Sequence, residues 1–261
     1  DYAFDGIKDY TDLIRYVESM LTDTNIGLFI DEVQEISQFE KALRHFQLTE
    51  MYDIYCTGSN SSILSGDIAT LLRGRTIELE VFSLSYPEFL VFHGLSDNAE
   101  SFEKYLIIGG MPNLIQLPKE EEVVFNYLKN IFNTIVVRDV IERHQIRNTA
   151  FLRNLCEFLA DNLGSLVSGK KISDYLKSQK VSMSPAMVIE YLNFLCDAYF
   201  IYKVKRSDLQ GKKTFEISEK YYFNDHGLRN SLIGFKAPDI SKLIENIVFN
   251  QIGRASCRER V

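Results

Sequence analysis

A short apolar run that ends on two adjacent carboxylates constrains this chain more than any other feature. Residues 25–35 read NIGLFIDEVQE, so apolar residues lead directly into Asp31 and Glu32. A run of this length and composition predicts a buried β-strand. In open α/β sheets, ligands bind at the carboxyl ends of the strands. The acid pair is therefore predicted to face a ligand; the alternative is a strand followed by a helix whose first turn is acidic.

A second short strand is predicted just before Thr57, and it also breaks into small polar residues. Residues 53–62 read DIYCTGSNSS, which places Thr57 and Ser59 after the strand. A third β-rich run, Thr76–Val81, follows the sequence Arg-Gly-Arg at 73–75. Helical patterns separate these runs, and such alternation predicts parallel strand pairing in an α/β layer. The alternative role for the two hydroxyls is local bonding to the backbone.

Several segments in a fixed order resemble one known family. LFIDEVQEI, YCTGSNSSIL and LLRGRTIELEVFSLSYPEFL resemble AAA+-related P-loop ATPases whose Walker B strand ends in Asp-Glu-Val-Gln. IVVRDVIERHQI and KYYFNDHGLRNSLIG are similar to later segments of that family. Its members continue into a winged helix and a restriction-endonuclease-like domain of unknown role. The resemblance covers about residues 24–250, and the ordered series is more specific than any single motif.

The resemblance implies ATP and Mg²⁺ as cofactors and a role for each polar residue. Asp31 would hold the magnesium ion through water, and Glu32 would activate the hydrolytic water. Thr57 or Ser59 would sense the γ-phosphate, and Arg75 would stabilise its charge in the transition state, in cis or in trans. For Arg75 the alternative is a surface salt bridge.

The phosphate-binding loop of such ATPases is missing from the sequence. There is no Gly-x-x-x-x-Gly-Lys-Ser/Thr, and the nearest glycine pair, Gly109-Gly110, has neither the lysine nor the hydroxyl in register. In the family this loop lies upstream of Asp1. We therefore expect an ATPase in the intact protein and a fragment here that binds ATP poorly and is inactive. The final segment, residues 253–261, resembles translated vector sequence.

The predicted fold class is α/β: an incomplete, doubly wound parallel sheet of AAA+ type, then a helical lid and a winged-helix domain. Ser85 and Glu88 have the spacing of a capping box at the start of the helical part. Asp225 is interpreted as a turn and helix cap. The expected divisions are 1–95 for the partial ATPase core, 96–147 for the lid, 148–240 for the winged helix, 241–252 for the start of a truncated C-terminal domain and 253–261 for the vector-derived tail.

Basic residues within 148–240 raise the question of a nucleic-acid partner. The recognition helix of a winged helix enters the major groove of DNA, and here it would begin near Ser184. Its outward residues include Glu190, which a phosphate backbone repels. Alternatives are a solvated surface and a protein partner, with the ATPase part as a vestigial scaffold. The candidate phosphate contacts are Lys170, Lys171, Lys203, Lys205, Arg206, Lys212 and Lys213.

Composition excludes several other classes. A net charge of -7 argues against general coating of nucleic acid, and charges interrupt every long apolar run, so no membrane span is expected. The 46% hydrophobic and 25% charged content is that of a globular protein. The four cysteines have no CxxC spacing, which argues against a zinc site and suits a reducing cytoplasm. The sequence does not indicate an oligomeric state.

Overall fold

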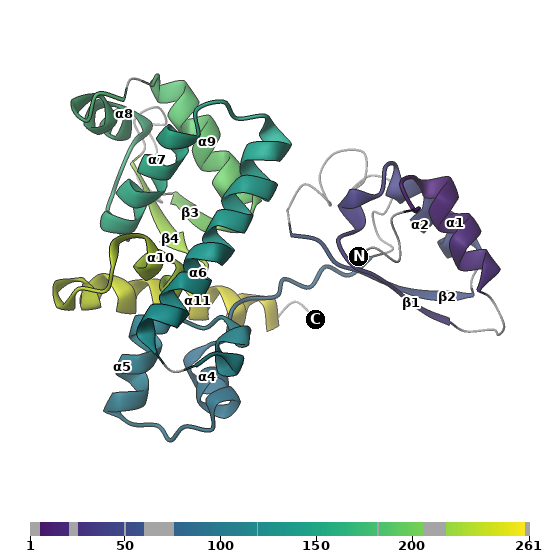
Figure 1. Cartoon of the computed structure of the whole chain (residues 1–261), viewed down its shortest axis with the longest axis horizontal. Helices are drawn as coiled ribbons and strands as arrows, with labels where there is room; N and C mark the ends of the chain where they lie inside the picture. The colour runs from purple at the N-terminus through teal and green to yellow at the C-terminus, as the bar shows by residue number, and fades with distance from the viewer. Residues whose placement is uncertain are drawn as a thin grey trace. The chain divides into compact units, whose positions relative to one another are not determined.

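The structure is a computed structural model that describes residues 6–20, 26–49, 51–59, 76–118, 120–181, 183–205 and 218–258. It divides into two compact units, Asp1–Leu79 and Glu80–Val261, each of which is described by itself (Figure 1). The described elements combine a small parallel sheet with a larger number of helices. Among the described residues, every helix is too short or too polar to cross a membrane.

The first unit is built on a pair of parallel strands. β1 pairs with β2 so that Ile26 lies opposite Tyr52 and Ile30 lies opposite Cys56. Helix α1 begins after Asp9, whose carboxylate accepts the backbone N–H groups of Thr11 and Asp12. The elements are α1 (Tyr10–Ser19), β1 (Ile26–Ile30), the 3₁₀ turn η2 (Val33–Glu35), α2 (Phe39–Leu48) and β2 (Tyr52–Cys56).

One face of this strand pair packs against the helices and the other carries exposed aromatic rings. Successive side chains of a strand point to opposite faces. Ile30 therefore lies in the core with residues of α1 and α2 such as Leu13 and Phe46. On the opposite face Phe29 is 76% exposed and stacks on Tyr55, with ring centroids 4.8 Å apart.

The predicted third strand at Thr76–Val81 is wrong. Residues 76–81 are described, but they belong to no strand, and Ile77, Leu79 and Val81 are exposed. Their alternating pattern suits a strand, but a strand forms only beside another strand that bonds its backbone. Among the described residues no such partner is aligned with this segment.

The second unit is mostly helical. Helix α4 begins at the predicted capping box, where the Glu88 carboxylate accepts the Ser85 N–H at 2.8 Å. The elements are α4 (Tyr86–His93), α5 (Ala99–Ile108), η4 (Pro112–Gln116), α6 (Glu121–Thr134), η5 (Ile135–Glu142), α7 (Thr149–Asp161), α8 (Gly169–Ser178), α9 (Pro185–Asp197), β3 (Ile201–Lys205), β4 (Glu219–Phe223), α10 (His226–Ile233), η6 (Ala237–Asp239) and α11 (Ile240–Arg258).

Three helices followed by two antiparallel strands occupy the region predicted as a winged helix. Ser168 caps α8, and Ser184 caps α9 directly before a proline in its first turn. β3 and β4 pair with Ile201 opposite Phe223, and the segment between them, 206–217, lies outside the described residues. The elements of a winged helix are present in order, but the assignment stays a prediction.

The long helix that starts with α6 changes its winding partway along its length. α6 continues directly into η5, a π-helix over Ile135–Glu142. π-Helical stretches are rare, and most occur as a single turn inserted in an α-helix. Asp139 is buried within this stretch.

Candidate functional site

The parallel register brings the polar residues after β1 and β2 together. Because the strands end opposite each other at Ile30 and Cys56, Asp31 and Thr57 emerge at the same edge. The Thr57 hydroxyl donates a short hydrogen bond to Asp31 Oδ1. The Thr57 backbone N–H donates to the Ile30 carbonyl at 2.9 Å. The threonine is thus fixed by its backbone and contacts the first acid through its side chain.

Thr57 also holds the turn that carries the second acid. The backbone N–H of Glu32 donates to Thr57 Oγ1 at 3.2 Å, and that of Val33 donates to the Thr57 carbonyl at 3.1 Å. Glu32 has φ +52°, in the left-handed region, which costs a non-glycine residue roughly 1–2 kcal/mol. Val33 is fully buried and anchors the turn. A strained residue between two fixed neighbours is common at functional sites.

The Glu32 carboxylate is held by its own turn. The side-chain amide of Gln34 donates a short hydrogen bond to Glu32 Oε2. Glu32 is half-buried, whereas Asp31 is exposed. Gln34 Oε1 is buried and has no hydrogen-bond partner among the described residues. Sequence reasoning did not assign Gln34 a role, although an amide two residues after an acid is a known local partner.

The oxygen atoms at this edge are ligands that suit magnesium. Asp31 and Thr57 present a carboxylate and a hydroxyl, and Mg²⁺ prefers such hard oxygen ligands while it retains several waters. Within the described residues, no three side chains of His, Cys, Asp or Glu converge on a common point. Only one or two carboxylates are needed for a magnesium ion held largely by water and phosphate.

The nearest glycine pair is used for packing and not as a phosphate cradle. A Cβ at Gly110 would lie 2.2 Å from the Leu84 carbonyl oxygen, and one at Gly109 would lie 2.3 Å from Asp225 Oδ1. Both glycines are buried, and a carboxylate beside them would repel a phosphate. The described residues therefore fit the metal but include no loop that fits the phosphates.

Two further predicted site residues are Ser59 and Arg75. Ser59 lies two residues beyond Thr57 and is half-buried. Arg75 lies outside the described residues. Asp31, Glu32 and Thr57 are thus the predicted residues that the structure brings together.

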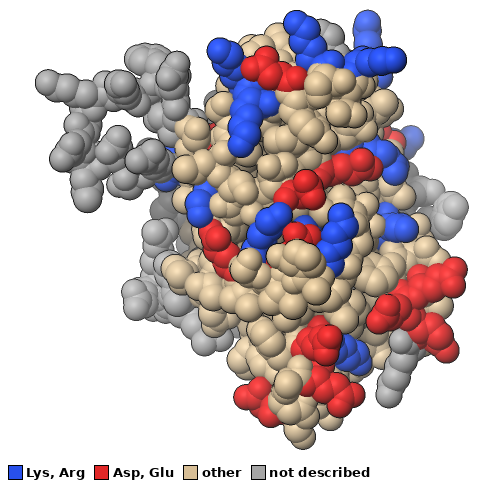
Figure 2. All heavy atoms as spheres, turned by 90° about the vertical axis from the view of Figure 1, so that its left-hand side faces the viewer, with Lys and Arg blue, Asp and Glu red and all other residues tan. Residues whose placement is uncertain are grey.

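The predicted phosphate contacts of the second unit lie on α8 and β3. Lys170, Lys171 and Lys205 are exposed, whereas Lys203 donates to Asn193 Oδ1 at 2.9 Å. Figure 2 shows basic side chains gathered at the end of the unit that carries α8 and acidic ones at the end with α4 and α5. Helix α9 has no lysine or arginine. Arg206, Lys212 and Lys213 lie outside the described residues.

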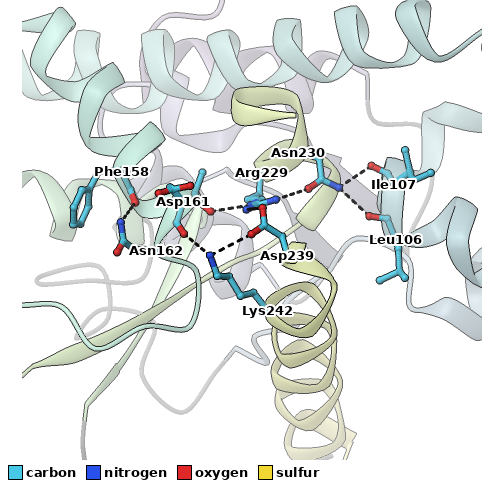
Figure 3. Close-up of polar contacts among 10 residues, drawn as sticks. Leu106, Ile107, Phe158, Asp161, Asn162, Arg229, Asn230, Asp239 and Lys242 are labelled. Carbon is cyan, nitrogen blue, oxygen red and sulfur yellow. Dashed lines mark hydrogen bonds and ion pairs between the residues drawn. The ribbon is translucent and has the colours of Figure 1, made fainter. Parts of the chain in front are cut away.

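A buried polar network holds α10 in the centre of the second unit (Figure 3). Arg229 is fully buried and donates to the Ala160 carbonyl at 2.8 Å and to Asp239 Oδ2 at 2.6 Å. The Asn230 amide donates to the carbonyls of Leu106 and Ile107, both at 2.9 Å. These bonds join α10 to α5, α7 and η6. We assign a structural role to Arg229 and Asn230, which belong to the segment KYYFNDHGLRNSLIG, since all of their described partners lie within the second unit.

The predicted helix cap at Asp225 is confirmed. Its carboxylate accepts the N–H groups of Gly227 and Leu228 at the start of α10. The neighbouring His226 is fully buried, and burial lowers the pKa of its imidazole. Its Nε2 lies 2.6 Å from the Tyr105 carbonyl oxygen, so the neutral ring donates there.

Comparisons with known proteins agree with this architecture. Residues 1–90 match an AAA domain. The Walker-type ATPase PABY2304 of Pyrococcus abyssi has the same fold, with a TM-score of 0.58 over 88% of this chain and 81% of that one, at 14% identity. The first 90 residues are therefore similar to an AAA domain, and the chain shares the fold of a Walker-type ATPase.

Residues 99–239 match a second family, described as Domain of unknown function (DUF8612), and the chain belongs to that family. An uncharacterized protein of Haemophilus influenzae is 33% identical over 97% of the chain, and one of Methanocaldococcus jannaschii is 30% identical over 95%. The chain spans 64% and 57% of the lengths of these two relatives.

Proposed function

We propose that the first unit is the Walker B half of an ATP-hydrolysing site. The observation that carries the proposal is the contact of Asp31, Glu32 and Thr57 at the carboxyl edge of two parallel strands. Asp31 would hold Mg²⁺ through water, with the Thr57 hydroxyl beside it. Glu32, oriented by Gln34, would accept a proton from the attacking water.

The proposal assigns the phosphates to a part of the longer protein that precedes Asp1. Bound Mg²⁺ would neutralise charge on the phosphate oxygens. The hydroxyls of Thr57 and Ser59 are the candidates for sensing the γ-phosphate, and Arg75 is the candidate for stabilising its charge.

Hydrolysis would drive a rearrangement that involves the second unit. Support comes from the order α7, α8, α9, β3 and β4, which is that of a winged helix. The buried bonds of Arg229 and Asn230 tie α10 to helices on both sides of it, so we expect the unit to move as a rigid body.

The test is ATP hydrolysis by a longer version of the chain that extends upstream of Asp1. We expect Glu32→Gln to lower turnover about 10²- to 10⁴-fold, the usual contribution of a general base, while a fluorescent ATP analogue still binds. Glu35→Gln changes an exposed carboxylate three residues away and serves as the matched control. If Glu32→Gln turns over ATP as fast as the parent protein, the assignment of the base is wrong.

Contact with nucleic acid is a second candidate, favoured by the exposed lysines of α8. Lys170 and Lys171 stand at its first turn, while the absence of cations from α9 argues for contact with phosphates and not with bases. Binding to duplex DNA should then weaken steeply with salt. Replacing both lysines by alanine should lower the slope of log K against log salt by about 0.9 per lost phosphate contact. Absence of binding at low salt would remove this candidate.

A further inference from the structure

Two side chains in the turn after β1 contact each other although their spacing is unusual for such a contact. Glu32 and Gln34 are two positions apart, and Gln34 lies in the 3₁₀ turn η2. Side chains two positions apart on a helix do not face each other. Glu32 precedes the turn with φ +52° and ψ +48°, which is outside the geometry of a right-handed helix. This strained backbone accompanies the contact, in which the Gln34 amide donates to Glu32 Oε2.

The hydrogen bond fixes which end of the Gln34 amide faces the acid. If the amide were turned over, its oxygen would point at the carboxylate, and two acceptors would repel each other. With Nε2 toward Glu32, Gln34 Oε1 is buried and has no hydrogen-bond partner among the described residues. A buried acceptor without a partner costs stability. The fold therefore keeps an amide at position 34 that the packing around its oxygen does not favour.

The Glu32 carboxylate is held through one oxygen. Its backbone is fixed, because its N–H donates to Thr57 Oγ1 at 3.2 Å and that of Val33 donates to the Thr57 carbonyl at 3.1 Å. The bond from Gln34 then fixes Oε2. In the part of the chain that the structure describes, Oε1 of Glu32 has no hydrogen-bond partner, so this oxygen is available to a water molecule.

We propose that Gln34 is a positioning residue for the hydrolytic step, which fixes Oε2 of Glu32 so that Oε1 accepts the proton of the attacking water. This inference rests on the proposed function. A general base must lie within hydrogen-bond reach of the proton that it removes. A misplacement of about 1 Å can cost about 100-fold in rate. The bond from Gln34 also favours the ionised carboxylate, which is the form that accepts a proton.

Gln47 offers a matched control on α2 of the same unit. Like Gln34, it is half-buried, and its side-chain oxygen is buried with no partner among the described residues. No described hydrogen bond joins it to Glu32. Methionine at either position keeps the length of the side chain and removes the amide. Because each substitution removes a buried acceptor that lacks a partner, we expect neither to lower the melting temperature of the chain.

The test is the pH dependence of ATP hydrolysis in the longer version of the protein that extends upstream of Asp1. We expect Gln34→Met to lower kcat at least about tenfold with little change in KM for ATP. The acid side of the pH–rate profile should move to higher pH, because a carboxylate that has lost a donor is protonated more readily. Gln47→Met should behave as the parent protein does. If Gln34→Met fails to fold, Gln34→Glu keeps the size, removes the donor and should give the same loss and the same shift.

The outcomes separate the role of Gln34 from that of Glu32. A parent-like kcat in Gln34→Met, while Glu32→Gln is slow, would overturn the role of Gln34 and leave the proposed function intact. A loss of kcat with an unchanged pH–rate profile would show a structural role for Gln34 and would also overturn the inference. If Glu32→Gln hydrolyses ATP as fast as the parent protein, the proposed function fails, and the inference fails with it.

Discussion

The carboxylate of Asp225 joins the start of α10 to Gly110, which lies 115 positions earlier in the chain. Its Oδ2 accepts the Gly110 N–H at 2.8 Å, while its Oδ1 accepts the N–H groups of Gly227 at 2.8 Å and Leu228 at 3.1 Å. One side chain therefore caps a helix and bonds a distant loop. Because all three donors are buried, the loss of this carboxylate leaves them without partners.

Asp225→Ala should accordingly lower the free energy of unfolding by about 2–4 kcal/mol, the sum of a lost cap and an unsatisfied buried N–H. Asn148→Ala removes the more exposed cap of α7 and should cost about 1 kcal/mol. Urea unfolding followed by far-UV circular dichroism measures both, since the chain has no tryptophan. Equal costs for the two variants would show that the bond to Gly110 contributes nothing.

Gly110→Ala should be among the most damaging substitutions of a small residue. Its Cβ would lie 2.2 Å from the Leu84 carbonyl oxygen, a backbone atom that cannot rotate away. We expect a loss of at least about 3 kcal/mol. Gly253→Ala is the control: it lies within α11 with open surroundings and no positive φ, so we expect no loss and a gain of up to about 1 kcal/mol. Thermal unfolding of the two variants compares them, and a smaller loss at Gly110 would contradict the packing role.

Asp239 should contribute to the acid sensitivity of the second unit. Burial alone would raise the pKa of its carboxyl, but the bonds from Arg229 and Lys242 outweigh that effect and lower the pKa below 3.8. Because the folded pKa is the lower one, the stabilisation is complete above about pH 3.8 and is lost as the pH falls through the folded-state pKa. Asp239→Asn should thus flatten the loss of stability below that pH.

The same variant should also cost about 3 kcal/mol near neutral pH, because Arg229 stays buried without a counter-charge. Glu245→Gln breaks a pair with Lys220 that is partly exposed, so it should cost less than about 1 kcal/mol. Urea unfolding across a pH series separates the two effects. A parallel pH dependence in Asp239→Asn and the parent chain would contradict the assignment.

Thr57→Val tests the proposed metal role in the longer protein. It removes the hydroxyl that bonds Asp31 and accepts from the Glu32 backbone, so the Mg²⁺ concentration for half-maximal hydrolysis should rise about 10- to 100-fold. Thr57→Ser keeps the hydroxyl and should change it little. A magnesium titration of ATP hydrolysis gives the comparison, and similar values for both variants would remove Thr57 from the site.

Local sequence signals predicted the candidate site because each of its residues directly follows a strand that the sequence itself reveals. Apolar runs that end in polar residues identified the ends of β1 and β2, and parallel pairing then required Asp31 and Thr57 to meet. The left-handed backbone of Glu32 and its bond from Gln34 were not predictable, because they depend on how the turn closes over Thr57. The prediction of a strand at Thr76–Val81 was wrong because an alternating pattern is a local signal, whereas a strand also needs a partner strand that the local sequence does not reveal.

The amino-acid sequence by itself determined the helix starts at Ser85, Ser184 and Asp225, because a capping side chain acts within a few residues of its own position. Only the tertiary structure decided what those elements contact. It placed Gly110 against Leu84 and Asp225, and Arg229 against Asp239 and the Ala160 carbonyl. Such contacts join positions far apart in the chain, and they form because buried polar groups must find partners wherever the fold brings them together.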